Sequence, residues 1–240
     1  MTSESKRRLA EIRGFIFKMK ITFYDGIKNN KPCRYLTLKE VYEFVRNSPN
    51  AGLIETIRTH KSNNDNTYRE LKLQLPLITP HVQAVGRKLA GDDFDKNFQS
   101  FTQLMYFDID NVENAESEKQ RIINQYGDFV SFVCISPSGR GISIIIQIEN
   151  ELTRVNFDML WLSIRMNEFK DENIDMKATG IGRTMFISSD QDVYYNPNVS
   201  LAVDLISLCV SPTFINIPRA SNGCASTAGT VKADGVLAKR

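Results

Sequence analysis

The chain has 240 residues and a net charge of only +2, with 42% hydrophobic and 24% charged residues. These values are ordinary for a globular protein of one domain or slightly more, and they exclude a globally cationic nucleic-acid-binding chain. No apolar run approaches the roughly 20 residues of a membrane helix. Residues 1–14 lack the apolar core of a signal peptide. We therefore expect a cytoplasmic protein with no membrane partner.

The first hundred residues are typical of a mixed α/β segment. Thr37 followed by Glu40 is a capping box, and apolar residues at helical spacing come directly after it. The stretch from 63 to 80 is rich in asparagine and broken by two prolines. This composition predicts a loop followed by short extended segments.

The strongest periodic signals lie between residues 101 and 200. In chain order they predict a strand, a helix, two strands joined by a turn, a second helix and a last strand, at 101–110, 114–127, 129–136, 142–149, 152–170 and 183–188. This β-α-β-β-α-β order is typical of the RRM or ferredoxin-like arrangement, a palm. We expect an α+β protein whose first and third palm strands lie at the centre of the sheet.

Three regions follow from these patterns. Residues 1–100 are expected to form an N-terminal α/β extension that packs on the palm, and residues 101–210 the palm itself. Residues 211–240 are rich in small and polar side chains, which predicts a flexible linker or tail.

Two carboxylates, Asp108 and Asp110, end the apolar run LMYFDID. Residues two apart on a strand point to one face, so both acids project together. Like charges held that close repel unless a cation or a shared proton relieves them. The four cysteines and two histidines are too scattered for a zinc site of the usual spacing, so a hard cation with oxygen ligands is favoured.

Further polar groups suit phosphate chemistry. The turn PSGRG, residues 137–141, offers backbone N–H groups that glycine lets approach a phosphate. Asp175 is a third carboxylate, and Lys177 and Arg183 after it carry positive charge. Each feature has a plainer interpretation, since the acid pair suits a turn or helix cap and PSGRG suits a hairpin.

In their order and spacing, YFDID, SPSGRGISIII and NIDMK followed by GRTMFISS resemble the archaeo-eukaryotic primase superfamily. They are most similar to primase–polymerase-like domains of the VirE N-terminal type, over about residues 65–200. The resemblance implies two-metal nucleotidyl transfer with Mg²⁺ or Mn²⁺ in mobile-element or phage DNA replication. It implies that Asp108, Asp110 and Asp175 are the catalytic and metal-binding residues. With the motif chemistry, it assigns nucleotide binding to Ser136, Ser138, Gly139, Arg140, Gly141, Ser143, Lys177, Arg183 and Ser188.

The expected partners are a single-stranded DNA template, nucleoside triphosphates and a helicase domain or protein. A palm of this type holds its template across the sheet, and local basic residues would supply the attraction. We assign that role to Lys72, Arg87 and Lys88 in the segment before the palm.

One departure from the family pattern leaves an alternative open. Many members carry a histidine where this chain has Ser143, and a hydroxyl supplies no positive charge. The chain would then be a catalytically degenerate primase-like module that binds single-stranded DNA and recruits a helicase. A phosphatase of the haloacid dehalogenase type is disfavoured because Asn111 follows the acid pair. A sugar transferase with a D-x-D manganese site leaves the PSGRG turn unexplained.

Overall fold

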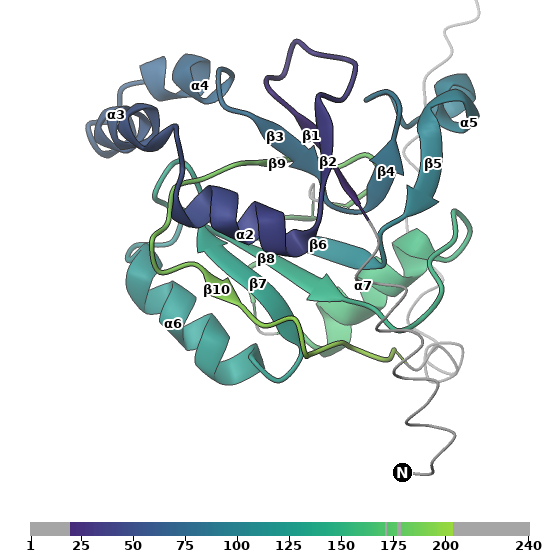
Figure 1. Ribbon diagram of the computed structural model, residues 1–240. Helices are drawn as coiled ribbons and strands as arrows, with labels where there is room; N and C mark the ends of the chain where they lie inside the picture. The colour runs from purple at the N-terminus through teal and green to yellow at the C-terminus, as the bar shows by residue number, and fades with distance from the viewer. Residues whose placement is uncertain (1–19, 171, 177–178, 204–240) are drawn as a thin grey trace, which may run out of the picture. The chain divides into compact units, whose positions relative to one another are not determined.

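The computed structural model describes residues 20–203, apart from 171 and 177–178 (Figure 1). All of them belong to one compact unit, Met1–Leu205. The predicted linker at 211–240 and the nucleotide-binding candidate Lys177 lie outside the described residues. Within the described part of the chain, none of the helices has the length and apolar character needed to cross a membrane.

Two four-stranded antiparallel sheets form the fold. The first contains β1 (Ile21–Tyr24), β2 (Arg34–Leu36), β3 (Leu77–Thr79) and β9 (Met185–Phe186), in the order β2-β1-β3-β9. The second contains β6 (Leu104–Asp110), β7 (Val130–Ile135), β8 (Gly141–Gln147) and β10 (Tyr194–Tyr195), in the order β10-β7-β8-β6. A separate pair joins β4 (Val82–Ala84) to β5 (Phe98–Phe101). The fold is a mixed α+β one with antiparallel sheets, as expected.

The described helices are α2 (Leu38–Arg46), α3 (Ala51–Ser62), α4 (Thr67–Lys72), α5 (Phe94–Asn97), α6 (Ala115–Tyr126) and α7 (Phe157–Asn167), with a 3₁₀ turn at Gly91–Asp93. The capping box before α2 is confirmed: Glu40 N–H donates to Thr37 Oγ1 at 3.2 Å, and Thr37 N–H donates to Glu40 at 2.6 Å. The interpretation of residues 63–80 as a loop followed by short extended segments fits the turn at 63–66 and β3, but it was wrong at 67–72, where α4 lies. The Asp65 carboxylate accepts the Thr67 N–H at 2.9 Å and so begins this short helix.

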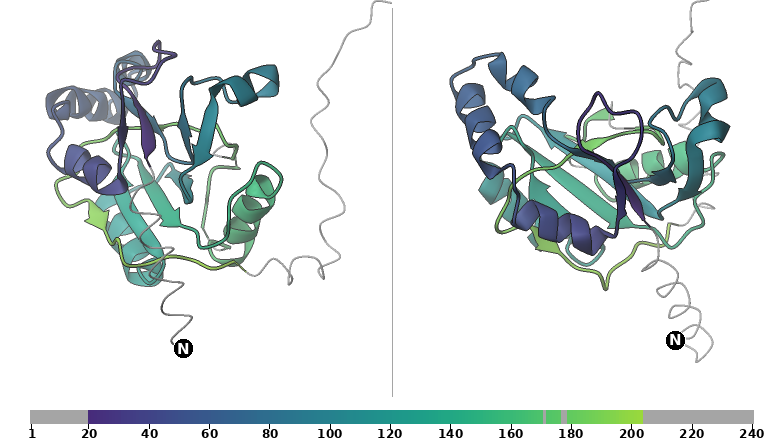
Figure 2. Two further views of the ribbon diagram at one scale, coloured as in Figure 1. Left: turned by 45° about the vertical axis from the view of Figure 1, so that its right-hand side comes forward. Right: turned by 45° about the horizontal axis from the view of Figure 1, so that its top comes forward.

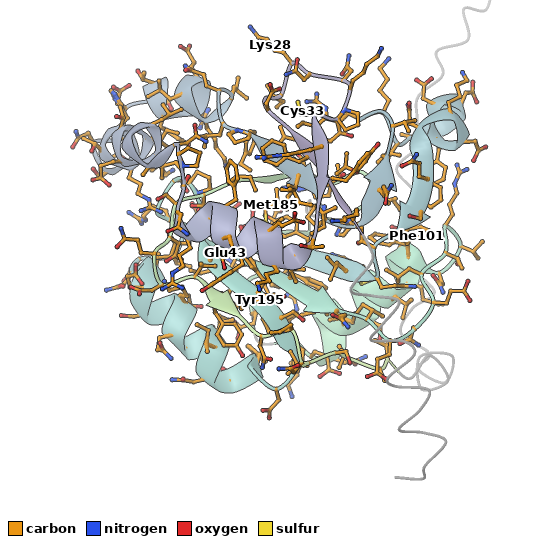
Figure 3. All side chains as sticks on the ribbon, viewed as in Figure 1. Lys28, Cys33, Glu43, Phe101, Met185 and Tyr195 are labelled. Carbon is orange, nitrogen blue, oxygen red and sulfur yellow. The ribbon has the colours of Figure 1, made fainter. Side chains whose placement is uncertain are left out.

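Both faces of the second sheet are covered. Apolar side chains of α6 and α7 pack on one face, where they meet Phe107, Ile109 and Ile144. Side chains of β1, β3, β9 and α2 pack on the other, against Tyr106 and Ile145. In Figure 1, α2 runs across the front of the sheet and α7 lies behind it. Figure 3 labels Met185 and Tyr195 on the two sides of α2. Ligands must therefore approach this sheet at its ends or its edge.

The palm order holds as far as the second helix. The sequence β6-α6-β7-β8-α7 follows the expected β-α-β-β-α, and β8 lies between β6 and β7. The expected last strand does not join this sheet, because Met185 pairs with Ile78 of the first sheet. The other edge of β6 has only a single bridge, between Ile109 and Ile174, so the first palm strand lies at the edge of the sheet and not, as expected, at its centre. Strand β9 belongs to the expected palm (residues 101–210), whereas β1, β2 and β3 belong to the expected N-terminal extension (residues 1–100). The two expected regions therefore share one sheet.

Candidate functional site

The D-x-D pair lies at the end of β6, facing the turn at the start of β8. Asp108 pairs with Ser143, and Ser143 pairs in turn with Cys134 on β7, so the three form a row across the sheet. Asp110 pairs with Gly141. Asp108 is partly buried and Asp110 is exposed. The two carboxylates therefore lie on one face of the strand, and Asp108 is the more deeply buried of the two.

Burial makes ionisation of Asp108 costly. Desolvation, followed by the charge of Asp110, raises the pKa of the Asp108 carboxyl to about 6, while the positive charges of Lys72 and Arg183 act in the opposite direction. Ser143 Oγ lies 3.4 Å from Asp108 Oδ1 and 3.4 Å from the Tyr106 hydroxyl. These contacts supply neutral hydrogen-bonding groups, so charge compensation must come from the two cations or from a ligand.

The turn before β8 is tightly closed. Ser136 N–H donates to the Gly141 carbonyl at 2.8 Å, and Gly139 N–H donates to the Ser136 carbonyl at 3.0 Å. Gly139 has φ of 69°, a left-handed conformation that favours glycine. Ser136 Oγ and Ser138 Oγ are 3.0 Å apart. The predicted Ser-Gly segment is thus one compact turn beside the acid pair.

Arg140 extends from this turn toward the loop after β6. Its side chain is exposed, and Nε donates to the Val112 carbonyl at 2.8 Å. This contact places the guanidinium near the end of the D-x-D strand, where a ligand at Asp110 would meet it.

Asp175 lies next to the acid pair despite its separation in sequence. Its main-chain N–H donates to the Asp108 carbonyl at 2.8 Å, following the Ile109–Ile174 bridge. Its carboxylate forms an ion pair with Arg183 at 3.6 Å. The structure therefore joins Asp108, Asp175 and Arg183 at one edge of the sheet.

Among the described residues, no three acidic, histidine or cysteine side chains are grouped closely enough to hold a metal ion by themselves. The donor chemistry nevertheless suits a hard cation, because Asp108 and Asp110 present carboxylate oxygens on one face. Magnesium commonly binds through one or two carboxylates and completes its shell with water and substrate phosphates. A two-carboxylate site at the end of β6 fits that pattern.

An open pocket of about 530 Å³ lies beside this strand end, lined in part by Asp110, Asn114 and Glu172. Its one arginine, Arg121, is already paired with Glu172 and Glu118, at 2.5 and 2.6 Å. The charged side chains of the lining are thus mostly acidic, which disfavours phosphate there.

His81 is a site residue that the sequence analysis did not identify. Its ring is fully buried, Nε2 accepts the Tyr106 N–H at 3.0 Å, and Nδ1–H donates to the Gly180 carbonyl at 3.1 Å. Burial lowers the pKa of His81 to about 4, so the ring is neutral. His81 therefore ties β6 to the segment that leads to Arg183. An isolated histidine in an apolar run gives no sequence signal for this role.

Asp190 is a second such residue, and it anchors the segment that contains Ser188. Its carboxylate pairs with Lys119 of α6 at 2.8 Å, and both side chains are almost completely buried. The same carboxylate accepts the Ile135 N–H at 2.9 Å, directly before Ser136. Ser188 itself is buried, and its hydroxyl has no hydrogen-bond partner among the residues that the structure describes.

The three residues assigned to nucleic acid do not form one surface. Lys72 ends α4, and its ammonium lies 5.2 Å from the centre of the Phe186 ring. Arg87 donates to the Ile27 carbonyl, and Lys88 lies 3.9 Å from Asp93. In Figures 1 and 2, α4 and β4 lie on opposite sides of β1. The expected path of a template across the sheet is also wrong, since both faces are covered.

The comparison with protein families covers the residues of this site. The family described as "BT4734-like, N-terminal domain" matches residues 70–195, more than half of the chain. The chain belongs to this family. The searches of curated proteins and of solved structures found no match.

The matched part of the BT4734-like domain begins within α4 and ends at β10. It contains the acid pair, the Ser-Gly turn, Asp175 and Arg183. It leaves out β1, β2, α2 and α3, which complete the first sheet and its helices.

Proposed function

We propose that this chain is a primase–polymerase-like nucleotidyltransferase of the archaeo-eukaryotic primase type, acting in mobile-element or phage DNA replication. The observation that carries the proposal is the convergence of three motifs at the end of β6. Asp108 and Asp110 share one face, the Ser-Gly turn lies opposite them, and Asp175 is hydrogen-bonded to Asp108 through the main chain. Sequence resemblance and spatial adjacency support the same reaction class.

Asp108 and Asp110 would hold Mg²⁺ or Mn²⁺ in this reaction. When bound, such a cation polarises a phosphoryl oxygen and stabilises the charge that develops on the attacking and leaving oxygens. Asp175 is the third carboxylate, and its ion pair with Arg183 sets its position.

The Ser-Gly turn and the basic residues would orient the nucleotide. The N–H groups of Ser136 and Gly139 donate within the turn, so its hydroxyl groups, those of Ser136 and Ser138, would be the donors to phosphate oxygens. Arg183, adjacent to Asp175, and Arg140, beside Val112, supply charge-assisted donors. Ser188, whose buried hydroxyl has no hydrogen-bond partner among the described residues, would be a further donor.

The proposal includes several finer points. The second sheet with α6 and α7 would correspond to a primase palm in which the N-terminal sheet covers the face opposite the helices. A single-stranded DNA template would enter along the end of the sheet, and Arg87 and Lys88 would contact it away from the acids. The reaction would take place in the cytoplasm, next to a helicase domain or protein.

Nucleotide incorporation tests the proposal. Purified protein is incubated with a single-stranded template, labelled nucleotides and Mg²⁺ or Mn²⁺, beside the Asp108→Asn/Asp110→Asn variant. We expect labelled product from the wild type, with a loss of at least about a hundredfold in the variant, as is usual when catalytic electrostatics are removed. Asp158→Asn, an exposed acid on α7, is the matched control and should keep full activity. Equal product from all three proteins would reject the assignment.

The second candidate is the non-catalytic module, and Ser143 is the observation that favours it. The hydroxyl contacts Asp108 and Tyr106 and provides no charge for a triphosphate. A wild-type protein that binds single-stranded DNA but incorporates no nucleotide with either metal would select this alternative. Ser143→His would then be the informative variant, because restored incorporation would identify the missing cation.

A further inference from the structure

Buried hydrogen-bond donors that lack a partner are concentrated around Lys72 and Arg183, which we call the basic side of the site. Among the described residues, five buried side-chain polar atoms lack a hydrogen-bond partner, and three of these are Arg58 Nε, Arg183 Nε and Ser188 Oγ. Burying a donor without a partner costs about 1–3 kcal/mol, so such groups call for an explanation, often a ligand or ion. All three are donors, and a ligand rich in acceptor oxygens would satisfy them.

Arg58 reaches the site from α3, outside the family match. Its Nη2 donates to the Ser189 carbonyl at 2.8 Å. Its Cγ and Nε lie 3.1 and 3.5 Å from the position that a Cβ on Gly139 would take. Arg58 therefore touches the Ser-Gly turn with one part of its side chain and the segment after β9 with another.

Lys72 reaches the same region from α4. Its ammonium lies over the ring of Phe186, which is two residues before Ser188. The charge of Lys72 also acts on the Asp108 carboxyl. Lys72 and Arg183 thus both act on the Asp108 carboxyl, and we group Lys72 with Arg183 rather than with Arg87 and Lys88.

We propose that Arg58 and Lys72 join Arg183 in binding the phosphates of the nucleotide, so that two of these three cations come from α3 and α4. The inference rests on the proposed function and extends it to residues that the motifs do not include. Three cations and a buried hydroxyl suit a polyanion better than a single carboxylate, because guanidinium groups pair with phosphate oxygens in a fork. The Gly139 turn leaves room for the Arg58 side chain, and any larger residue there would displace it.

Binding of inorganic tripolyphosphate to the full chain tests this inference. Calorimetry in the presence of EDTA measures the cationic side of the site without metal. We expect Arg58→Ala and Lys72→Ala each to weaken binding about tenfold or more, the range for a charge-assisted hydrogen bond. Arg58→Lys keeps the charge but not the fork, and should restore only part of the affinity. Thermal melting will show whether Arg58→Ala is folded. If it is not, Arg58→Lys tests the role of Arg58 in its place.

Arg154→Ala is the matched control. Arg154 is an exposed arginine paired with Asp95 and Phe94, on a different part of the fold, and its loss should leave tripolyphosphate binding unchanged. Wild-type affinity in both Arg58→Ala and Lys72→Ala would overturn the inference and leave the proposed function standing. Failure of the wild type to bind tripolyphosphate would overturn the inference as well. Tripolyphosphate binding that requires Arg58 and Lys72, without any nucleotide incorporation, would keep the anion site and reject the proposed polymerase activity.

Discussion

Gly141 and Asp110 face each other across the antiparallel pair of β8 and β6. A Cβ on Gly141 would lie 3.4 Å from Asp110 Oδ1, and only 2.8 Å from the Ile109 carbonyl oxygen. The glycine therefore allows the turn to close directly over the carboxylate. The motif glycine has a steric explanation here, independent of any resemblance to a family.

Gly141→Ala is expected to destabilise the protein and to reduce nucleotide incorporation. The added methyl group must displace main-chain atoms rather than a flexible side chain, which typically costs about 1–3 kcal/mol. Chemical denaturation measures the loss. Gly52→Ala is the control, because Gly52 lies in α3 with nothing within 4 Å of the added Cβ. Alanine is the better helix former, so this variant should be more stable than the wild type. Equal stability of Gly141→Ala and wild type would contradict the steric argument.

Asp108→Asn should stabilise the metal-free protein at neutral pH. The pKa of Asp108 is raised from 3.8 to about 6 in the folded state, so the folded protein binds more protons than the unfolded chain between these values. Stability is therefore lost as pH rises through this window, by at most about 3 kcal/mol. The variant should lack that loss and exceed the wild type at pH 7, with the two converging near pH 4. Denaturation in EDTA across this pH range measures the difference. A destabilised variant at pH 7 would show that Asp108 is not strained by burial.

His81→Gln should change the response to acid in the opposite direction. Burial lowers the pKa of His81 from 6.5 to about 4, so the unfolded chain binds the extra proton first. This contribution to stability is present above pH 6.5 and is lost as pH falls toward 4, on the order of 3 kcal/mol in all. His81→Gln should be less stable at pH 7 but should lose less on acidification. The comparison is made in the Asp108→Asn background, where the opposing titration is absent. Parallel pH profiles with and without His81 would refute the buried neutral ring.

Lys119→Met should destabilise the protein strongly. Lys119 and Asp190 have side chains only 4% and 3% exposed, and removal of the lysine leaves a buried carboxylate without its counter-ion. Such losses are typically about 3–5 kcal/mol. Lys96→Met, at a lysine that is 71% exposed, is the control and should have little effect. Urea denaturation distinguishes the two, and a mild effect at Lys119 would mean that Asp190 finds its charge compensation elsewhere.

The elements that the sequence predicted well are those with a local cause. The capping box at Thr37 and the Ser-Gly turn depend on residues within a few positions of one another. Alternation along β6 also predicted that the two acids share one face of the strand. These features require no knowledge of the tertiary structure.

The elements that the sequence did not predict depend on distant contacts. Met185 and Phe186 form a good strand pattern, but the pattern does not specify the partner strand, and β9 pairs with β3 rather than with β6. The contact of Arg58 with Ser189 spans 131 positions. His81 and Asp190 have roles set wholly by burial, for which a single sequence carries no marker.

The shared first sheet determines how short a piece of this chain can fold. A fragment cut at residue 70 would lack β1 and β2, which leaves β3 with an open edge. It would also uncover Tyr106, Phe132 and Ile145, which now pack against the missing strands and α2. Exposed apolar strands of this kind favour aggregation. The smallest autonomous folding unit is therefore longer than the segment by which the family is recognised, and it includes β1, β2 and α2.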